Sequence, residues 1–199
     1  MEAFKRLDAV AMPLAGINID TDQVVPARYL QKPRSDNFGD YLFRDLRQRA
    51  DGAEIADFPL NRPEWRAARI IVAGRNFGCG SSREHAVWAL FDYGFRVAIA
   101  PSFGDIFAGN SLKNGFLPVV LPESVVAATL AHLQAHPGAR ITVDLETQKV
   151  VLPDSGEHAF DIAPFARRCL LEGLDEIDYT LTHLAALQAF ERRHAAEGF

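Results

Sequence analysis

The sequence predicts one mixed α/β domain, spanning residues 1–199, with a parallel sheet at its centre. Two observations support this fold class. Short apolar runs rich in β-branched residues occur at 69–74, 97–100 and 119–121, and segments with helical periodicity separate them. Strands that alternate with helices at this spacing are typical of βαβ units and hence of parallel sheets. The chain has no internal repeat and no low-complexity linker, and its 199 residues are enough to bury one sizeable core.

The remaining elements follow from periodicity and from residues that form turns. Strands are predicted at 8–14, 69–74, 97–100, 119–121, 141–145 and 149–152. Helices are predicted at 82–92, 103–112, 125–133, 164–172 and 179–194. The polar segment 26–40 is interpreted as an exposed loop, and residues 146–148 as the turn of a hairpin. Four apolar residues of the last helix are expected to face the core: Leu181, Leu184, Leu187 and Phe190.

The charge and the cysteines exclude several classes of protein. The net charge is −5 and the lysines and arginines are scattered, so the clustered basic face of a nucleic-acid-binding protein is missing. The first residues lack the pattern of a signal peptide, and no apolar run approaches the length of a membrane span. The two cysteines, Cys79 and Cys169, suffice neither for a disulfide framework nor for a cysteine-based metal site. We therefore expect a cytoplasmic protein that binds no metal itself and has no membrane or nucleic-acid partner.

The segment from Gly78 to His85 is the strongest candidate for a functional site. Ser81 and Glu84 have the spacing of a capping box, which could simply satisfy N–H groups at the start of a helix. Arg83 is expected in the first turn of that helix, where the helix dipole disfavours a cation unless an anion lies nearby. The glycines allow a ligand to approach backbone N–H groups, and such groups together with a guanidinium can stabilise a serine alkoxide. These residues are what is needed to hold a carboxylate and to remove a proton from carbon.

Other chemistries fit this segment less well. The spacing Gly78-x-Gly80-x-x-Arg83 lacks the third glycine of a dinucleotide-binding fingerprint, and no P-loop motif follows Gly74. Ser81 and Ser82 do not lie in the G-x-S-x-G motif of serine hydrolases. Neither nucleotide binding nor serine hydrolysis is therefore expected.

Three residues near this segment have a structural as well as a functional interpretation. His85 is interpreted as structural rather than catalytic. Cys79 is interpreted as a small packing residue, because no partner histidine is evident for a nucleophilic thiol. Asn110 could equally cap a helix or support the site.

Residues 76–86 closely resemble the active-site motif of the swivelling domain of aconitase-type hydro-lyases. Residues 100–110 and 115–118 are similar to later parts of that domain, and residues 18–30 match its small-subunit branch. The resemblance continues through 169–178 and so covers nearly the whole chain. It implies a single swivelling β/β/α domain like the C-terminal domain of aconitase. The most similar branch comprises the small subunits of bacterial 3-isopropylmalate dehydratases, which are enzymes of leucine biosynthesis.

The resemblance implies a hydro-lyase subunit that is active only with a large subunit. The complex would isomerise 2-isopropylmalate, a small dicarboxylate, to 3-isopropylmalate by dehydration and rehydration. A 4Fe–4S cluster in the large subunit would act as a Lewis acid on the departing hydroxyl. The implied catalytic residues of this chain are Asp22 and Ser81, with Ser81 acting as an alkoxide base. The implied substrate-binding groups are Ser82, Arg83 and the backbone of Gly78, Cys79 and Gly80.

The sequence departs from the aconitase pattern in two places. Aconitases carry an acidic residue between the two glycines, where this chain has Cys79. Their substrate-binding arginine on the loop after the Asp22 position has no clear match. Residues 26–36 instead form what we name the specificity loop, in which the candidate residues are Arg28, Tyr29, Leu30, Lys32 and Arg34. The alternative substrates are therefore citramalate, homoaconitate and dimethylmalate, and the alternative outside the enzyme class is a stand-alone carboxylate-binding module.

Overall fold

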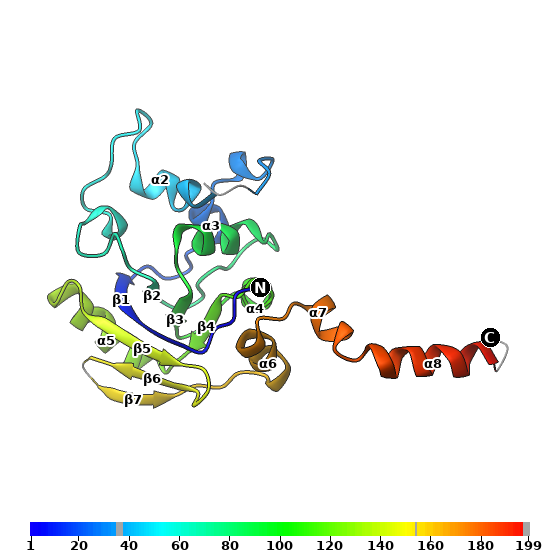
Figure 1. The fold of residues 1–199 in the computed structure, drawn as a ribbon. Coiled ribbons are helices and arrows are strands. Elements are labelled where there is room, and N and C mark those ends of the chain that lie inside the picture. The colour runs from blue at the N-terminus through cyan, green and yellow to red at the C-terminus, as the bar shows by residue number, and fades with distance from the viewer. Residues whose placement is uncertain (35–37, 154, 197–199) are drawn as a thin grey trace.

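The computed structural model describes residues 1–34, 38–153 and 155–196 of the chain (Figure 1). The strands are β1 Arg6–Leu14, β2 Ile70–Ala73, β3 Val97–Ala100, β4 Leu117–Val120, β5 Arg140–Asp144, β6 Lys149–Leu152 and β7 Gly156–Ala159. The α-helices are α1 Thr21–Val24, α2 Arg44–Arg47, α3 His85–Tyr93, α4 Asp105–Lys113, α5 Glu123–Ala135, α6 Pro164–Glu172, α7 Glu176–Leu181 and α8 Leu184–Ala196. Short 3-10 helices occupy Ala27–Tyr29, Phe38–Tyr41 and Pro59–Asn61. Every predicted strand is confirmed, and β7 is an additional strand that the sequence pattern does not predict.

One seven-stranded sheet, in the order β4-β3-β2-β1-β5-β6-β7, runs through the molecule. Its two halves meet in β1. Residues 11–14 of β1 pair with β2 in parallel, whereas residues 6–10 pair with β5 in the antiparallel direction. The half from β1 to β4 is parallel as predicted, and β5, β6 and β7 form an antiparallel meander. β2 and β3 are buried along their whole length, as expected for parallel strands that are covered on both faces.

Two hydrophobic clusters fill the space between the sheet and its helices. Alternate residues of β2 divide between them, with Ile71 and Ala73 in the first cluster and Ile70 and Val72 in the second. Buried apolar residues of α3 and α4 belong to the first cluster, and those of α5 and α6 to the second. No helix in the described part of the chain is long and apolar enough to span a membrane.

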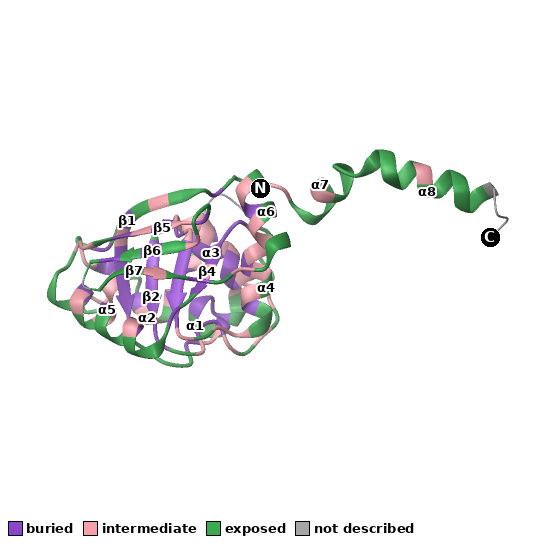
Figure 2. Ribbon diagram, turned by 90° about the horizontal axis from the view of Figure 1, so that it is seen from below, coloured by how far each residue is buried: buried purple, intermediate pink, exposed green. Residues whose placement is uncertain are grey.

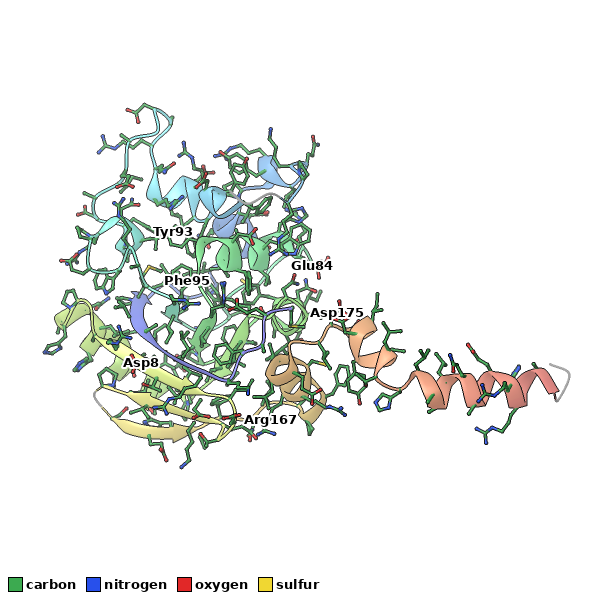
Figure 3. All side chains as sticks on the ribbon, in the orientation of Figure 1. Asp8, Glu84, Tyr93, Phe95, Arg167 and Asp175 are labelled. Carbon is green, nitrogen blue, oxygen red and sulfur yellow. The ribbon has the colours of Figure 1, made fainter. Side chains whose placement is uncertain are left out.

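The chain leaves this body after α6. Nε of Arg167 in α6 still donates to the carbonyl oxygen of Leu145 at 3.1 Å, which ties the helix to the β5–β6 hairpin (Figure 3). The predicted helix 179–194 is divided into α7 and α8, and α8 projects away from the sheet (Figures 1 and 2). The prediction that its apolar residues face the core is wrong, because they are 41–55% exposed: Leu181, Leu184, Leu187 and Phe190. Helices α3 to α6 supply the helical part of the two hydrophobic clusters, and no apolar residue of α8 belongs to either cluster.

The polar segment 26–40 is only partly the exposed loop that the sequence predicts. Pro26, Phe38 and Gly39 are buried, and the ring of Tyr29 stacks on that of Tyr41 with centroids 4.3 Å apart. The described residues between Tyr29 and Phe38 are exposed or half-buried, and residues 35–37 lie outside the described part of the chain. The two ends of the segment are therefore packed into the body.

Candidate active site

Three connections meet at the carboxyl edge of the parallel strands. They follow β1, β2 and β3 and comprise residues 15–20, 74–84 and 101–104. Isolated β-bridges join Asp20 to Cys79 and Phe77 to Phe103, so the connections lie side by side beyond the sheet. Ligands of open α/β sheets bind at this edge. The connection 74–84, which we name the serine loop, contains the predicted site residues from Gly78 to Arg83.

Two glycines allow the serine loop to lie directly against the start of α4. Gly78 has φ +71°, and a Cβ at this position would lie 2.3 Å from the ring of Phe107. A Cβ on Gly104 would lie 2.6 Å from the carbonyl oxygen of Gly78. Both separations are too short for any residue but glycine. Between the loop and α4 lies an open pocket of about 230 Å³, and Ser81 is part of its lining.

The backbone of Ser81 is fastened to the connection that follows β1. The N–H of Ser81 donates to Oγ1 of Thr21 at 3.1 Å. The N–H of Thr21 donates in turn to the carbonyl oxygen of Cys79 at 2.9 Å. Thr21 is buried, whereas Ser81 is half-buried. The serine loop thus rests on a buried support while Ser81 remains accessible from the pocket.

Arg83 lies outside α3, contrary to the prediction that it occupies the first helical turn. The helix begins at His85, and Glu84 is its N-cap residue. Nη1 of Arg83 donates to Oδ1 of Asp22 at 2.8 Å, so this carboxylate is the anion that balances the guanidinium. An arginine carries five N–H donors. The others make no hydrogen bond within the described residues and remain available to a ligand.

The capping box expected between Ser81 and Glu84 is not formed. The N-cap of α3 has no side-chain hydrogen bond. The Glu84 carboxylate, at the start of α3 in Figure 3, instead accepts from Nδ2 of Asn114 at 3.4 Å. Nδ2 of Asn110 donates to the carbonyl oxygen of Ser82 at 3.2 Å, so Asn110 supports the loop. Thr21 therefore accepts the Ser81 N–H that Glu84 would accept in a capping box, and Asn110 and Asn114 hold the loop by donating to it.

Comparison with known proteins identifies the family to which this site belongs. The family model of the aconitase C-terminal domain matches residues 1–124, and the LeuD_N model matches residues 130–164. A 3-isopropylmalate dehydratase small subunit from Roseobacter denitrificans is 48% identical over 195 residues, which cover 98% of this chain and 97% of that protein. Its namesake from Rhodospirillum centenum is 49% identical over 197 residues, covering 99% and 97% of the two chains. The chain belongs to the family of 3-isopropylmalate dehydratase small subunits.

A solved structure shows the same fold as this member of the small-subunit family. The crystal structure of a 3-isopropylmalate dehydratase (leuD) from Methanocaldococcus jannaschii superimposes with a TM-score of 0.66 and 24% sequence identity. The superposition covers 94% of this chain and 99% of the archaeal one. The predicted resemblance to the aconitase-type swivelling domain is thus confirmed, both by the family models and by the fold.

The two arginines of the specificity loop are engaged away from the serine loop. The guanidinium of Arg28 forms an ion pair with Asp45 of α2. Nη2 of Arg34 donates to Oδ1 of Asp92 in α3 at 2.7 Å. Leu30 is half-buried, and Lys32 is exposed and takes part in no ion pair within the described residues. The structure therefore brings Asp22 to the serine loop, and it brings neither arginine of the specificity loop there.

The cysteines and His85 lie in different surroundings, with Cys79 among the residues that line the pocket. Both thiols are free; Cys79 is half-buried in the serine loop, and burial raises the pKa of Cys169 in α6. Across residues 1–34, 38–153 and 155–196, no group of three or more histidine, cysteine, aspartate or glutamate side chains could hold a metal ion. The ring of His85 packs against Trp88 with centroids 4.6 Å apart, but its Nδ1 is buried and makes no hydrogen bond within the described residues, so the structural interpretation stays a prediction.

The sequence reasoning missed Thr21, the residue that joins α1 to Ser81. A local signal for it exists. Oδ1 of Asp20 accepts from the N–H of Gln23 at 2.7 Å, and Oε1 of Gln23 accepts from the N–H of Asp20 at 3.0 Å. This capping box predicts a helix that begins at residue 21. Its recognition would have placed Thr21 and Asp22 together in the first turn of a helix.

Proposed function

We propose that this chain is the small subunit of a hydro-lyase that isomerises 2-isopropylmalate to 3-isopropylmalate in leucine biosynthesis. The observation that carries the proposal is the serine loop, where Ser81 opens onto a pocket and Arg83 faces Asp22. It occurs in a chain that is 48% identical to a protein of that name. The proposal treats residues 1–199 as one swivelling domain, located in the cytoplasm, that is active only in complex with a large subunit.

In this proposal Ser81 transfers the proton. Its alkoxide accepts a proton from the substrate carbon, and the electron pair of the C–H bond becomes the double bond of isopropylmaleate. The hydroxyl leaves from the neighbouring carbon as hydroxide. Hydroxide then adds with the opposite orientation while Ser81 returns its proton to the other carbon, which yields the isomer and restores the alkoxide. A positioned base of this kind contributes about 10²- to 10⁴-fold to the rate.

The remaining site residues hold the substrate in this proposal. Arg83 has donors left over from its hydrogen bond to Asp22, and a guanidinium can bind a carboxylate through two parallel hydrogen bonds. Ser82 and the backbone of residues 78–80 complete the carboxylate site. Asp22 holds the guanidinium, so that its free donors point at the substrate.

The proposal assigns the 4Fe–4S cluster to the large subunit. The described residues of this chain do not fit such a cluster, because Cys79 and Cys169 lie on separate elements and no third ligand accompanies either. When bound in the partner, the cluster supplies a Lewis acid for the departing hydroxyl. This chain supplies the base and the carboxylate site.

Reconstitution tests the proposed function. The chain is mixed with a cluster-loaded large subunit, and 2-isopropylmalate, citramalate, homoaconitate and dimethylmalate are compared as substrates. The ultraviolet absorbance of the unsaturated acid that belongs to each substrate, isopropylmaleate in the first case, is followed. We expect 2-isopropylmalate to have the highest kcat/KM. Preference for another acid would reassign the substrate, and inactivity with every acid would contradict the proposal. Tight binding of isopropylmalate to the isolated chain in calorimetry would favour a stand-alone binding module instead.

A further inference from the structure

Thr21 is a buried residue that touches the serine loop at two points. It lies at the first position of α1 and is only 4% exposed. Its Oγ1 accepts the N–H of Ser81 at 3.1 Å, and its own N–H donates to the carbonyl oxygen of Cys79 at 2.9 Å. A third hydrogen bond joins the same two segments, from the N–H of Gly78 to the carbonyl oxygen of Ile19 at 2.8 Å. Segment 19–21 therefore holds the serine loop by three hydrogen bonds, at Gly78, Cys79 and Ser81.

Of the three hydrogen bonds between segment 19–21 and the serine loop, only the one to the Thr21 hydroxyl involves a side chain. The bonds to Cys79 and Gly78 run between backbone groups and would form with almost any residue in those places. The bond to Ser81 requires a side-chain acceptor at position 21. The capping box of Asp20 and Gln23 fixes the start of α1, where Thr21 lies. The identity of residue 21 therefore matters for Ser81 in particular.

Ser81 needs such an anchor because the glycines before it can adopt many backbone conformations. Gly78 and Gly80 both have positive φ angles, +71° and +96°, and glycine populates many backbone conformations at little cost. The N–H of Ser81 lies in the plane of the peptide that joins Gly80 to Ser81. Holding this N–H on Thr21 fixes that plane, and with it the ψ angle of Gly80 and the place of the Ser81 Cα from which the side chain starts.

We infer that Thr21 is a positioning residue for Ser81: its hydroxyl sets the orientation of the serine that, under the proposed function, takes the proton. A displacement of about 1 Å at a reacting group can cost about 10²-fold in rate. Loss of the hydroxyl therefore lowers kcat, whereas the carboxylate site around Arg83 and hence KM are left in place. Thr21 itself touches no reacting atom.

The decisive variant is Thr21→Val, which keeps the shape of the side chain and the backbone N–H but removes the acceptor. Thr21→Ser keeps the acceptor and serves as the rescue. Thr129→Val is the matched control, because Thr129 is also buried and its hydroxyl bonds to the carbonyl oxygen of Val125 within α5, away from the site. Each full-length variant is assembled with the cluster-loaded large subunit, and kcat and KM for 2-isopropylmalate are measured.

We expect T21V to lower kcat by about 10- to 100-fold with KM changed less than about threefold, and T21S and T129V to stay near wild type. Amide hydrogen exchange of Ser81, measured on the full-length chain without its partner, should accelerate in T21V alone. An unchanged kcat, a rise in KM alone, or unchanged exchange at Ser81 would overturn the inference. If T21V does not fold, the comparison of Thr21→Ala with T21S decides in the same way.

The inference rests on the proposed function, and the two can fail separately. A wild-type complex that turns over no 2-hydroxy acid contradicts the proposed function, and exchange at the Ser81 amide then decides whether Thr21 anchors that residue. An active wild-type complex in which T21V is equally active contradicts only the positioning role.

Discussion

Nη1 of Arg83 donates to Oδ1 of Asp22 at 2.8 Å, although the two are 61 positions apart in the chain. The side chains are 37% and 56% exposed. Ion pairs of this exposure contribute at most about 1 kcal/mol to folding. The ion pair therefore orients the guanidinium of Arg83 and contributes little to the stability of the fold.

Loss of this pair should weaken substrate binding. In Asp22→Asn we expect KM for 2-isopropylmalate to rise about tenfold, which corresponds to about 1.4 kcal/mol. The reason is that Arg83 loses the carboxylate that orients it. Steady-state kinetics of the reconstituted complex measure the effect, and Asp45→Asn is the control because it breaks a comparable surface pair at Arg28. A larger effect from D45N than from D22N would argue that the specificity loop holds the substrate.

Removal of the Ser81 hydroxyl should abolish most of the activity without affecting the fold. We expect Ser81→Ala to lower kcat by about 10²- to 10⁴-fold, because the base is lost. The melting temperature should stay within about 2 °C of wild type, since the anchoring hydrogen bond uses the backbone N–H of Ser81. Ser124→Ala, on an exposed position of α5, is the control. Activity retained in S81A would exclude this serine as the base.

Substitution of Gly78 should destabilise the protein strongly. In Gly78→Ala the new Cβ would lie 2.3 Å from the Phe107 ring at a φ of +71°, so clash and backbone strain add. We expect a loss of about 3 kcal/mol or more in the free energy of unfolding. Gly138→Ala has the same conformational strain at φ +88° but open space around its Cβ, and should lose only about 1 kcal/mol. Equal losses in the two variants would show that strain alone accounts for the need for glycine at position 78.

Removal of α8 should leave the stability of the body nearly unchanged. The apolar side chains of this helix are exposed, and Figure 1 shows it projecting from the sheet. We expect deletion of residues 183–199 to shift the melting temperature by less than about 3 °C, because little packed surface is lost. In contrast, Leu170→Ala in α6 removes a fully buried side chain and should cost about 2–5 kcal/mol. A drop comparable to that of L170A would mean that α8 packs on the body in solution.

A carboxylate on β1 should make part of the stability dependent on pH. Oδ2 of Asp8 accepts from the Thr142 hydroxyl at 2.8 Å, and this bond and Arg140 hold the pKa of Asp8 below its ordinary value of 3.8. Because the folded state has the lower pKa, the contribution is present above pH 3.8 and is lost as the pH falls through the folded value. We expect Asp8→Asn to destabilise the protein at pH 7 by less than about 1 kcal/mol, given the exposure of the pair. Urea unfolding at several pH values checks this, and a difference that persists undiminished at the most acidic pH would contradict it.

Local patterns in the sequence were sufficient for much of the fold. The β-branched runs at 70–73 and 97–100 predict buried parallel strands, because only strands covered on both faces are apolar at every position. The motif from Gly78 to Arg83 also indicates its chemistry, since glycines, a serine and an arginine are what carboxylate binding and proton removal require.

Only the tertiary structure decided which residues lie in contact with one another. The periodicity of residues 181–190 predicts a helix with one apolar face. It does not reveal that this face is exposed in the structure. The spacing of Ser81 and Glu84 allows a local capping box, yet it is Thr21 of α1 that accepts the Ser81 N–H, and Asn110 and Asn114 donate to the loop from the side of α4. The physical reason is that these hydrogen bonds join residues brought together at the carboxyl edge of the sheet, 28 to 60 positions apart in the chain. The sequence by itself predicted which residues carry the chemistry of this site, and only the tertiary structure decided which of them meet, because three separate connections come together there.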